Sequence, residues 1–182
     1  MQDAEAENQF LTEQQCIDLV KKGDKEAYST VVKKYMKKAY YIALGFVKTE
    51  PDALDVSQEA FIKAFRHIKK FKAGNDFFPW FYKILKNLCL DWLKKNKNVN
   101  LIPLENISLS NVSQPNEDIK IHLWKEMEKL SIDQKEILLL RYLQGFTYLE
   151  IAQILDKPLG SVMSSLHYAK KNLRKKMERF LK

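Results

Sequence analysis

Apolar residues recur every three or four positions along most of this chain, which is the period of an amphipathic α-helix. The clearest run is Ala27, Val31, Tyr35, Ala39 and Ile42. Glycine and proline are scarce, with five residues each, which disfavours a turn-rich β-fold. The pattern therefore predicts an all-α protein.

Capping residues mark the starts of several predicted helices. Three pairs have the spacing of a capping box: Thr12 with Gln15, Ser131 with Gln134, and Thr147 with Glu150. Asp24 and Thr49 are placed to cap two further helices. The helix that follows Thr49 is predicted to bury a stripe made of Leu54, Phe61, Phe65 and Ile68.

The three- to four-residue period of apolar residues is absent between Asn96 and Asp118. This stretch is rich in Asn and Ser and is interrupted by two prolines, so it is too polar to pack into a core. We therefore expect two small helical domains joined by a flexible linker. The expected segments are a disordered tail over 1–12, a first domain over 13–97, the linker over 98–118, and a second domain over 119–182.

Positive charge is concentrated in two blocks of the chain. The net charge is +8. Residues 62–98 hold ten basic residues against two acidic ones, and residues 160–182 hold seven against one. Two basic blocks favour two contacts with a polyanion such as DNA. The alternative is a pair of solvated lysine faces.

Several classes of function are disfavoured by what the sequence lacks. Cys16 and Cys89 lie far apart and no Cys/His cluster is present, so neither a metal site nor a cofactor is expected. Without paired carboxylates, a phosphate-binding loop or a nucleophile–histidine arrangement, no enzymatic activity and no small-molecule substrate are expected. The absence of a signal peptide or long apolar run predicts a cytoplasmic protein.

The strongest local motif is a helix-turn-helix from Thr147 to Lys171. Two helices flank a tight turn at 156–158, and the small Ala152 lies where they cross. Apolar residues are expected to face one another across the corner, namely Ile151 and Leu155 against Val162 and Leu166. The second helix would enter the DNA major groove. An ordinary helical corner is the alternative, but the basic cluster that follows favours DNA.

Three stretches of the chain read, in order, "DALDVSQEAFIKAFRHIKKF", "FPWFYKILKNLCLDWLKKNK" and "LSIDQKEILLLRYLQGFTYLEIAQILDKPLGSVMSSLHYAKKNLRKKM". Together they resemble the extracytoplasmic-function sigma factors of bacterial RNA polymerase. The resemblance covers about residues 13–182. It implies a subunit that binds core RNA polymerase, recognises the −35 and −10 promoter elements, and helps to melt the −10 DNA.

The first stretch resembles the family's polymerase-docking helix. Its acidic stripe would meet the clamp helices of the β′ subunit, although a solvated acidic face is the alternative. The implied docking residues are Asp52, Asp55, Gln58, Glu59 and Phe61.

The second stretch resembles the promoter-melting helix, preceded by the loop Lys70–Phe78. An aromatic ring can stack on an unpaired base, an amide can hydrogen-bond to it, and lysines can hold phosphate. The implied −10 residues are Lys72, Asn75, Phe77, Trp80, Lys83, Asn87 and Lys94. The alternative is that Phe77, Phe78 and Trp80 belong to the core.

The third stretch departs from the family around the recognition helix. Three customary basic positions are Met163, Ser165 and Tyr168, and a customary glycine in the turn is Asp156. Contacts to the −35 element are therefore expected to favour phosphate and DNA shape over guanine. The implied −35 residues are Thr147, Ser161, Ser164, Ser165, His167, Tyr168, Lys170, Lys171 and Arg174.

The resemblance also implies partners. These are core RNA polymerase, through the β′ clamp helices and the β flap, double-stranded and melted promoter DNA, and an anti-sigma factor. The main alternative is a two-domain transcription regulator that binds DNA alone. Such a regulator would not need the acidic stripe or the aromatic loop.

Overall fold

The computed structural model describes residues 11–72, 74–96 and 117–178, without the side chains of residues 117, 118, 120 and 121. Within these ranges all regular structure is helical, which confirms the all-α prediction. Most of the expected tail (1–12) and linker (98–118) lies outside the described residues. No helix in the described ranges combines the length and the hydropathy needed to span a bilayer.

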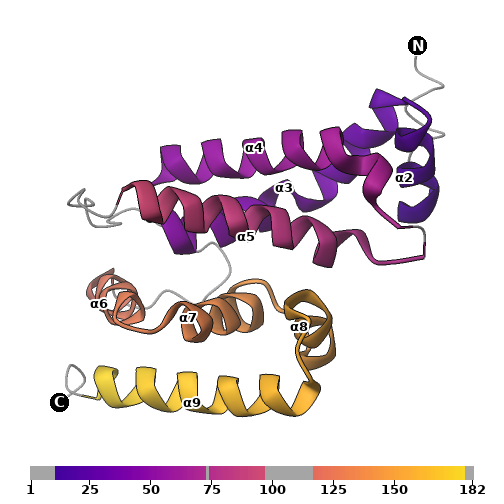
Figure 1. Ribbon diagram of the computed structural model, residues 1–182. Helices are drawn as coiled ribbons and strands as arrows, with labels where there is room; N and C mark the ends of the chain where they lie inside the picture. The colour runs from indigo at the N-terminus through magenta and orange to yellow at the C-terminus, as the bar shows by residue number, and fades with distance from the viewer. Residues whose placement is uncertain (1–10, 73, 97–116, 179–182) are drawn as a thin grey trace. The chain divides into compact units, whose positions relative to one another are not determined.

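The chain forms two compact units, residues 1–97 and 98–182 (Figure 1). The described helices of the first unit are α2 (Glu13–Lys21), α3 (Lys25–Val47), α4 (Glu50–His67), the 3₁₀ turn η1 (Ile68–Lys70) and α5 (Phe77–Lys95). Those of the second unit are α6 (Glu117–Glu128), α7 (Ile132–Leu138), the π-helical turn η2 (Leu139–Leu143), α8 (Tyr148–Leu155) and α9 (Leu159–Met177).

The long helix α3 packs against α2, α4 and α5 in the first unit. Aromatic rings fill the space between α3, α4 and α5, with the ring centroids of Phe61 and Phe81 4.4 Å apart. The Tyr28 hydroxyl donates a hydrogen bond of 2.6 Å to the Phe61 carbonyl, and so ties α3 to α4. Each fully buried ring of this kind contributes roughly 1.5–3 kcal/mol.

The predicted buried stripe of α4 is confirmed at Phe61 and Ile68 but not at Leu54. Leu54, expected in the core, is 45% exposed. The buried residues along α4 are instead mainly small, with Ala53, Ala60 and Ala64 fully buried. Small side chains let α4 pack closely on its neighbours, so the large Leu54 lies outside the contact.

The predicted helix starts are present. Thr12–Gln15 and Thr147–Glu150 each form both halves of a capping box. The Ser131 side chain accepts a hydrogen bond from the Gln134 N–H. Asp24 and Thr49 cap α3 and α4 in the same way. These local signals therefore predicted the starts of five helices correctly.

The helix-turn-helix consists of α8 and α9 in the second unit. Val162 and Leu166 of α9 are buried, as expected. From α8, however, Ile151 and Ile154 are the buried residues, whereas Leu155 is only half-buried. Asp156 ends α8 in the left-handed conformation with φ 55° and ψ 47°, so Leu155 already lies at the edge of the corner.

Candidate nucleic-acid and protein interfaces

The outer face of α4 carries both acidic and apolar side chains. Asp55 and Gln58 are exposed and Glu59 is half-exposed. Leu54 and Ile62, 45% and 46% exposed, lie one turn before and one turn after Gln58. We call these five residues the α4 face. The sequence prediction missed its two apolar members, although the four-residue spacing of positions 54, 58 and 62 was a signal for them.

Two predicted docking residues lie away from the α4 face. The Asp52 carboxylate accepts a hydrogen bond from Trp92 Nε1 at 3.2 Å and another from the Thr49 hydroxyl. Asp52 therefore closes the start of α4 and ties it to α5. Phe61 is buried against Phe81, so its assignment as a contact residue was wrong. Its ring supports the helix from inside the core.

The loop before α5 presents polar residues to solvent. Lys72 and Asn75 are exposed, as the −10 assignment requires. Gly74 has φ 81°, a conformation that side-chain-bearing residues rarely adopt. The backbone thus turns sharply between the two candidates, and Ala73 lies outside the described residues.

The aromatic residues around this loop divide into core and surface. Phe77 is 0% exposed, with its ring centroid 5.7 Å from Phe81 and 5.8 Å from Tyr35. Its assignment as a DNA contact was therefore wrong, because no part of the ring can reach a base. Trp80 is half-exposed, and its ring rests against Phe71 at 5.2 Å and Phe77 at 5.7 Å. The core thus holds Trp80 with part of its ring at the surface.

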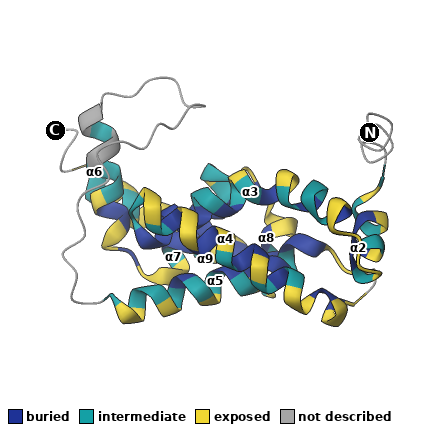
Figure 2. Ribbon diagram, turned by 90° about the horizontal axis from the view of Figure 1, so that it is seen from above, coloured by how far each residue is buried: buried dark blue, intermediate teal, exposed yellow. Residues whose placement is uncertain are grey.

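Helix α5 extends this surface along one side. Lys83, Asn87 and Lys94 are exposed, at helical spacings from Trp80. Figure 2 shows how buried and exposed residues alternate along α5. Lys94 Nζ lies 3.7 Å from Asp91 Oδ1. With Lys72 and Asn75, these residues form what we call the α5 surface: one partly exposed ring, two amides and three ammonium groups.

The two cysteines are packing residues. Burial raises the pKa of the Cys89 thiol to about 12. Burial, and then the nearby Glu13 carboxylate, raise the pKa of Cys16 as well. Both thiols therefore stay protonated at neutral pH and are poor nucleophiles. Within the described residues, no group of three or more His, Cys, Asp or Glu side chains could hold a metal ion.

Helix α9 presents most of the predicted −35 residues on its exposed side. Ser161, Ser164, His167, Lys171 and Arg174 are exposed. Tyr168 is also exposed, and Ser165 is half-buried. The Ser164 hydroxyl donates to the Gly160 carbonyl at 2.9 Å, which leaves its lone pairs for another donor. Thr147 uses its hydroxyl in the capping box of α8.

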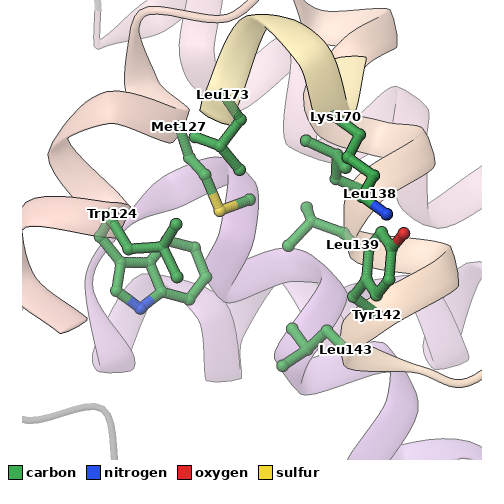
Figure 3. A pocket seen from close by; sticks show the side chains of 9 residues that line it. Trp124, Met127, Leu138, Leu139, Tyr142, Leu143, Lys170 and Leu173 are labelled. Atoms are coloured by element: carbon green, nitrogen blue, oxygen red, sulfur yellow. The ribbon is translucent and has the colours of Figure 1, made fainter. Parts of the chain in front are cut away.

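The second unit also contains an apolar pocket of about 260 Å³ (Figure 3). Its lining comes from α6, α7, η2 and α9: Leu123, Trp124, Met127, Leu138, Leu139, Tyr142, Leu143, Lys170 and Leu173. Trp124 and Tyr142 stand on opposite sides, and the Met127 thioether points between them. Lys170, one of the predicted −35 residues, therefore lies on the side of α9 that lines this pocket. The sequence prediction missed this pocket because it depends on how four segments converge.

Comparison with known families places these surfaces in context. Residues 31–99 match the Sigma-70 region 2 family and residues 122–173 match the Sigma-70, region 4 family. The ECF RNA polymerase sigma-E factor of Escherichia coli (strain K12) is 31% identical over 183 aligned positions, covering 92% of this chain and 95% of that protein. The sigma-E factor of Haemophilus influenzae is 30% identical, covering 92% and 96%.

Solved structures show the same fold. CnrH, in complex with the cytosolic domain of CnrY, superposes with a TM-score of 0.73 and 17% identity, covering 92% of this chain and 97% of that one. The sigma factor RpoE from Bartonella quintana, in complex with the anti-sigma factor NepR, has a TM-score of 0.67 and 20% identity, covering 83% and 96%. At these identities the likeness concerns the fold alone.

Proposed function

This chain belongs to the extracytoplasmic-function sigma factors and directs promoter-specific transcription initiation, and from that premise we propose which of its surfaces binds polymerase and which bind promoter DNA. The α4 face docks on the β′ clamp helices of core RNA polymerase. The α5 surface holds the melted −10 strand, and α9 reads the −35 element. The chain acts in the cytoplasm as a polymerase subunit without enzymatic activity of its own.

One observation carries this division. The first unit presents an acidic and apolar face on α4, and a basic, aromatic and amide-bearing surface on the loop and α5. The first suits a basic protein surface and the second suits single-stranded DNA. A regulator that binds duplex DNA alone needs neither.

Reconstitution tests the proposal directly. The chain, added to core RNA polymerase, is expected to yield run-off transcripts from a defined set of promoters. Core enzyme without the chain serves as the control. A chain that binds promoter fragments alone, and leaves initiation by core enzyme unchanged, would be a regulator of the competing class.

Promoter melting depends in this proposal on Asn87 and Trp80. Trp80→Ala removes a stacking ring, and the rate of open-complex formation is expected to fall by about 5- to 150-fold, the equivalent of ~1–3 kcal/mol per base. Asn87→Ala removes a hydrogen bond worth about 0.5–1.5 kcal/mol and should have a smaller effect. Permanganate reactivity of the holoenzyme–promoter complex measures both changes.

A matched control comes from Asn172, which is exposed on α9 in the other unit. Asn172→Ala removes the same amide and should leave the rate of melting unchanged. If both Asn87→Ala and Trp80→Ala gave wild-type permanganate footprints, the α5 surface would not hold the melted strand and its residues would have only a structural role.

The pocket of the second unit is proposed to receive the polymerase β flap. An apolar pocket beside a helix suits the apolar side chains of a partner helix. Tyr142, which is exposed at its edge, should matter most among the replaceable residues. Tyr142→Ala is expected to weaken binding of an isolated flap fragment by about 10-fold or more, as an aromatic anchor does.

Tyr148→Ala provides the comparison for this pocket variant. Tyr148 is an exposed tyrosine of the same unit, placed on α8 and absent from the pocket lining. Calorimetric titration of both variants with the flap fragment should separate them. If the two variants bound the flap fragment with equal affinity, the flap would bind elsewhere on the second unit.

An anti-sigma factor is proposed as the regulatory partner. The RpoE protein of Bartonella quintana, similar in fold, was solved with an anti-sigma factor. Affinity capture with the full chain, followed by loss of transcription when the captured protein is added to holoenzyme, would identify such a partner.

A further inference from the structure

Helix α9 exposes large apolar side chains on the part of the helix that precedes its basic cluster: Leu159 at its first residue, and Met163 and Tyr168 further along. Met163 is 51% exposed and Tyr168 is 60% exposed. Tyr168 lies against His167, with ring centroids 5.7 Å apart and an interplanar angle of 82°. Neither side chain belongs to the buried face, which consists of Val162, Leu166 and Ala169.

The polar residues around them offer little for reading guanine. Arginine is the main bidentate reader of guanine, and the chain has none between Arg141 and Arg174. Between residues 161 and 168 the exposed polar groups are two serines and one histidine, and the first lysines, Lys170 and Lys171, follow Tyr168. Of the features of the major groove, the C5-methyl group of thymine is the one that an apolar side chain recognises.

Charge on the same helix favours DNA over a protein as the occupant. Lys171, Arg174 and Lys175 are exposed in the turns that follow Tyr168. These ammonium and guanidinium groups suit phosphate, while the N-terminal half of a recognition helix lies over base edges. The apolar pair thus occupies the half of the helix that meets bases.

We propose that Met163 and Tyr168 recognise thymine in the −35 element through its C5-methyl group, each at a different base pair. This inference rests on the proposed function of α9 as the −35 reader. It adds the identity of the base that α9 selects. The two residues are five positions apart, about 7.5 Å along the helix and about 140° around it, so they would meet different base pairs.

Deoxyuridine tests the contact, because it differs from thymidine only by the C5-methyl group. The holoenzyme is titrated with a promoter from which it initiates in vitro, with each −35 thymine replaced singly by deoxyuridine. At two positions the affinity should fall about fourfold, the effect of removing one buried methyl group. In Met163→Ala one of these effects should disappear, and in Tyr168→Ala the other.

A change of specificity separates recognition from a structural role. Met163→Arg is expected to shift the preference at its own position from an A·T pair to a G·C pair, as a bidentate arginine does. Leu149→Ala is the matched control, because Leu149 is an exposed apolar residue of α8. It should retain both deoxyuridine effects.

Two results would overturn the inference, in different ways. If no deoxyuridine substitution weakens binding while Lys171→Ala still does, α9 binds the −35 element and the apolar pair serves a protein contact instead. If neither deoxyuridine nor Lys171→Ala has an effect, the proposed function of α9 fails together with the inference.

Discussion

Replacing Phe77 with alanine is expected to lower the unfolding free energy of the first unit by about 3–5 kcal/mol, the usual cost of deleting a buried phenyl ring. Phe77 is fully buried, and its ring contacts those of Tyr35, Phe71, Trp80 and Phe81. Removing it leaves a cavity that these rings cannot fill without leaving their own contacts.

The measurement can be confined to the first unit. The chain has three tryptophans, of which Trp80 and Trp92 lie in the first unit and Trp124 in the second. In a Trp124→Phe background, tryptophan fluorescence during urea denaturation follows the first unit alone. Leu54→Ala, which truncates a side chain already 45% exposed, should change its unfolding free energy much less.

The conservative variant distinguishes packing from DNA binding. Phe77→Leu keeps most of the buried volume, so it should fold and should melt promoters at nearly the wild-type rate. If Phe77→Ala unfolds at the wild-type urea concentration but melts promoters poorly, the ring contacts DNA in a conformation different from the one described.

Phe77 and Trp80 also show where sequence reasoning reaches its limit. Both are aromatic residues in the first turn of α5, and either could stack on a base. Which ring is buried depends on α3 and η1, which bring Tyr35 and Phe71 against Phe77. Such contacts between distant segments leave no local signal in the sequence. The sequence therefore did not decide which of these aromatic rings lies in the core and which lies at the surface.

Helix ends were predictable for the opposite reason. The Thr12–Gln15 and Thr147–Glu150 pairs act within one turn, so residue type and spacing are sufficient. The left-handed conformation of Asp156 also agrees with its residue type, because aspartate adopts this conformation more readily than most residues with a side chain. Leu54 was wrongly predicted to be buried because the residues that do form the helix contact are mainly alanines, and alanine gives a much weaker hydrophobic signal than leucine.

Reversing the charges of the α4 face is expected to impair holoenzyme assembly most strongly. In Asp55→Lys with Glu59→Lys, two attractions to a basic surface become repulsions. Close charge pairs across an interface are each worth about 1.5–7 kcal/mol, so the affinity for core polymerase should fall by at least about 100-fold. Both residues lie beyond the first turn of α4 and away from its buried face, so folding should be little affected.

A matched variant separates this effect from net charge. Asp18→Lys with Glu26→Lys makes the same charge change at two exposed acidic residues of the same unit, on α2 and α3. Its affinity for core polymerase should stay within a few-fold of wild type. Equal losses in both double variants would mean that polymerase senses the overall charge of the unit and not the α4 face.

Salt dependence divides the α4 face into its two kinds of contact. Ion pairs at an interface rim weaken as salt is added, whereas burial of an apolar side chain does not. The loss caused by the double charge reversal should therefore shrink between about 0.1 M and 1 M salt, as the Debye length falls from ~10 Å to ~3 Å. Ile62→Ala should cost about the same at both salt concentrations, because it removes apolar contact area. If the cost of Ile62→Ala followed that of the charge reversal, or if it had no effect, the apolar members of the α4 face would lie outside the interface and docking would rest on the acidic residues alone.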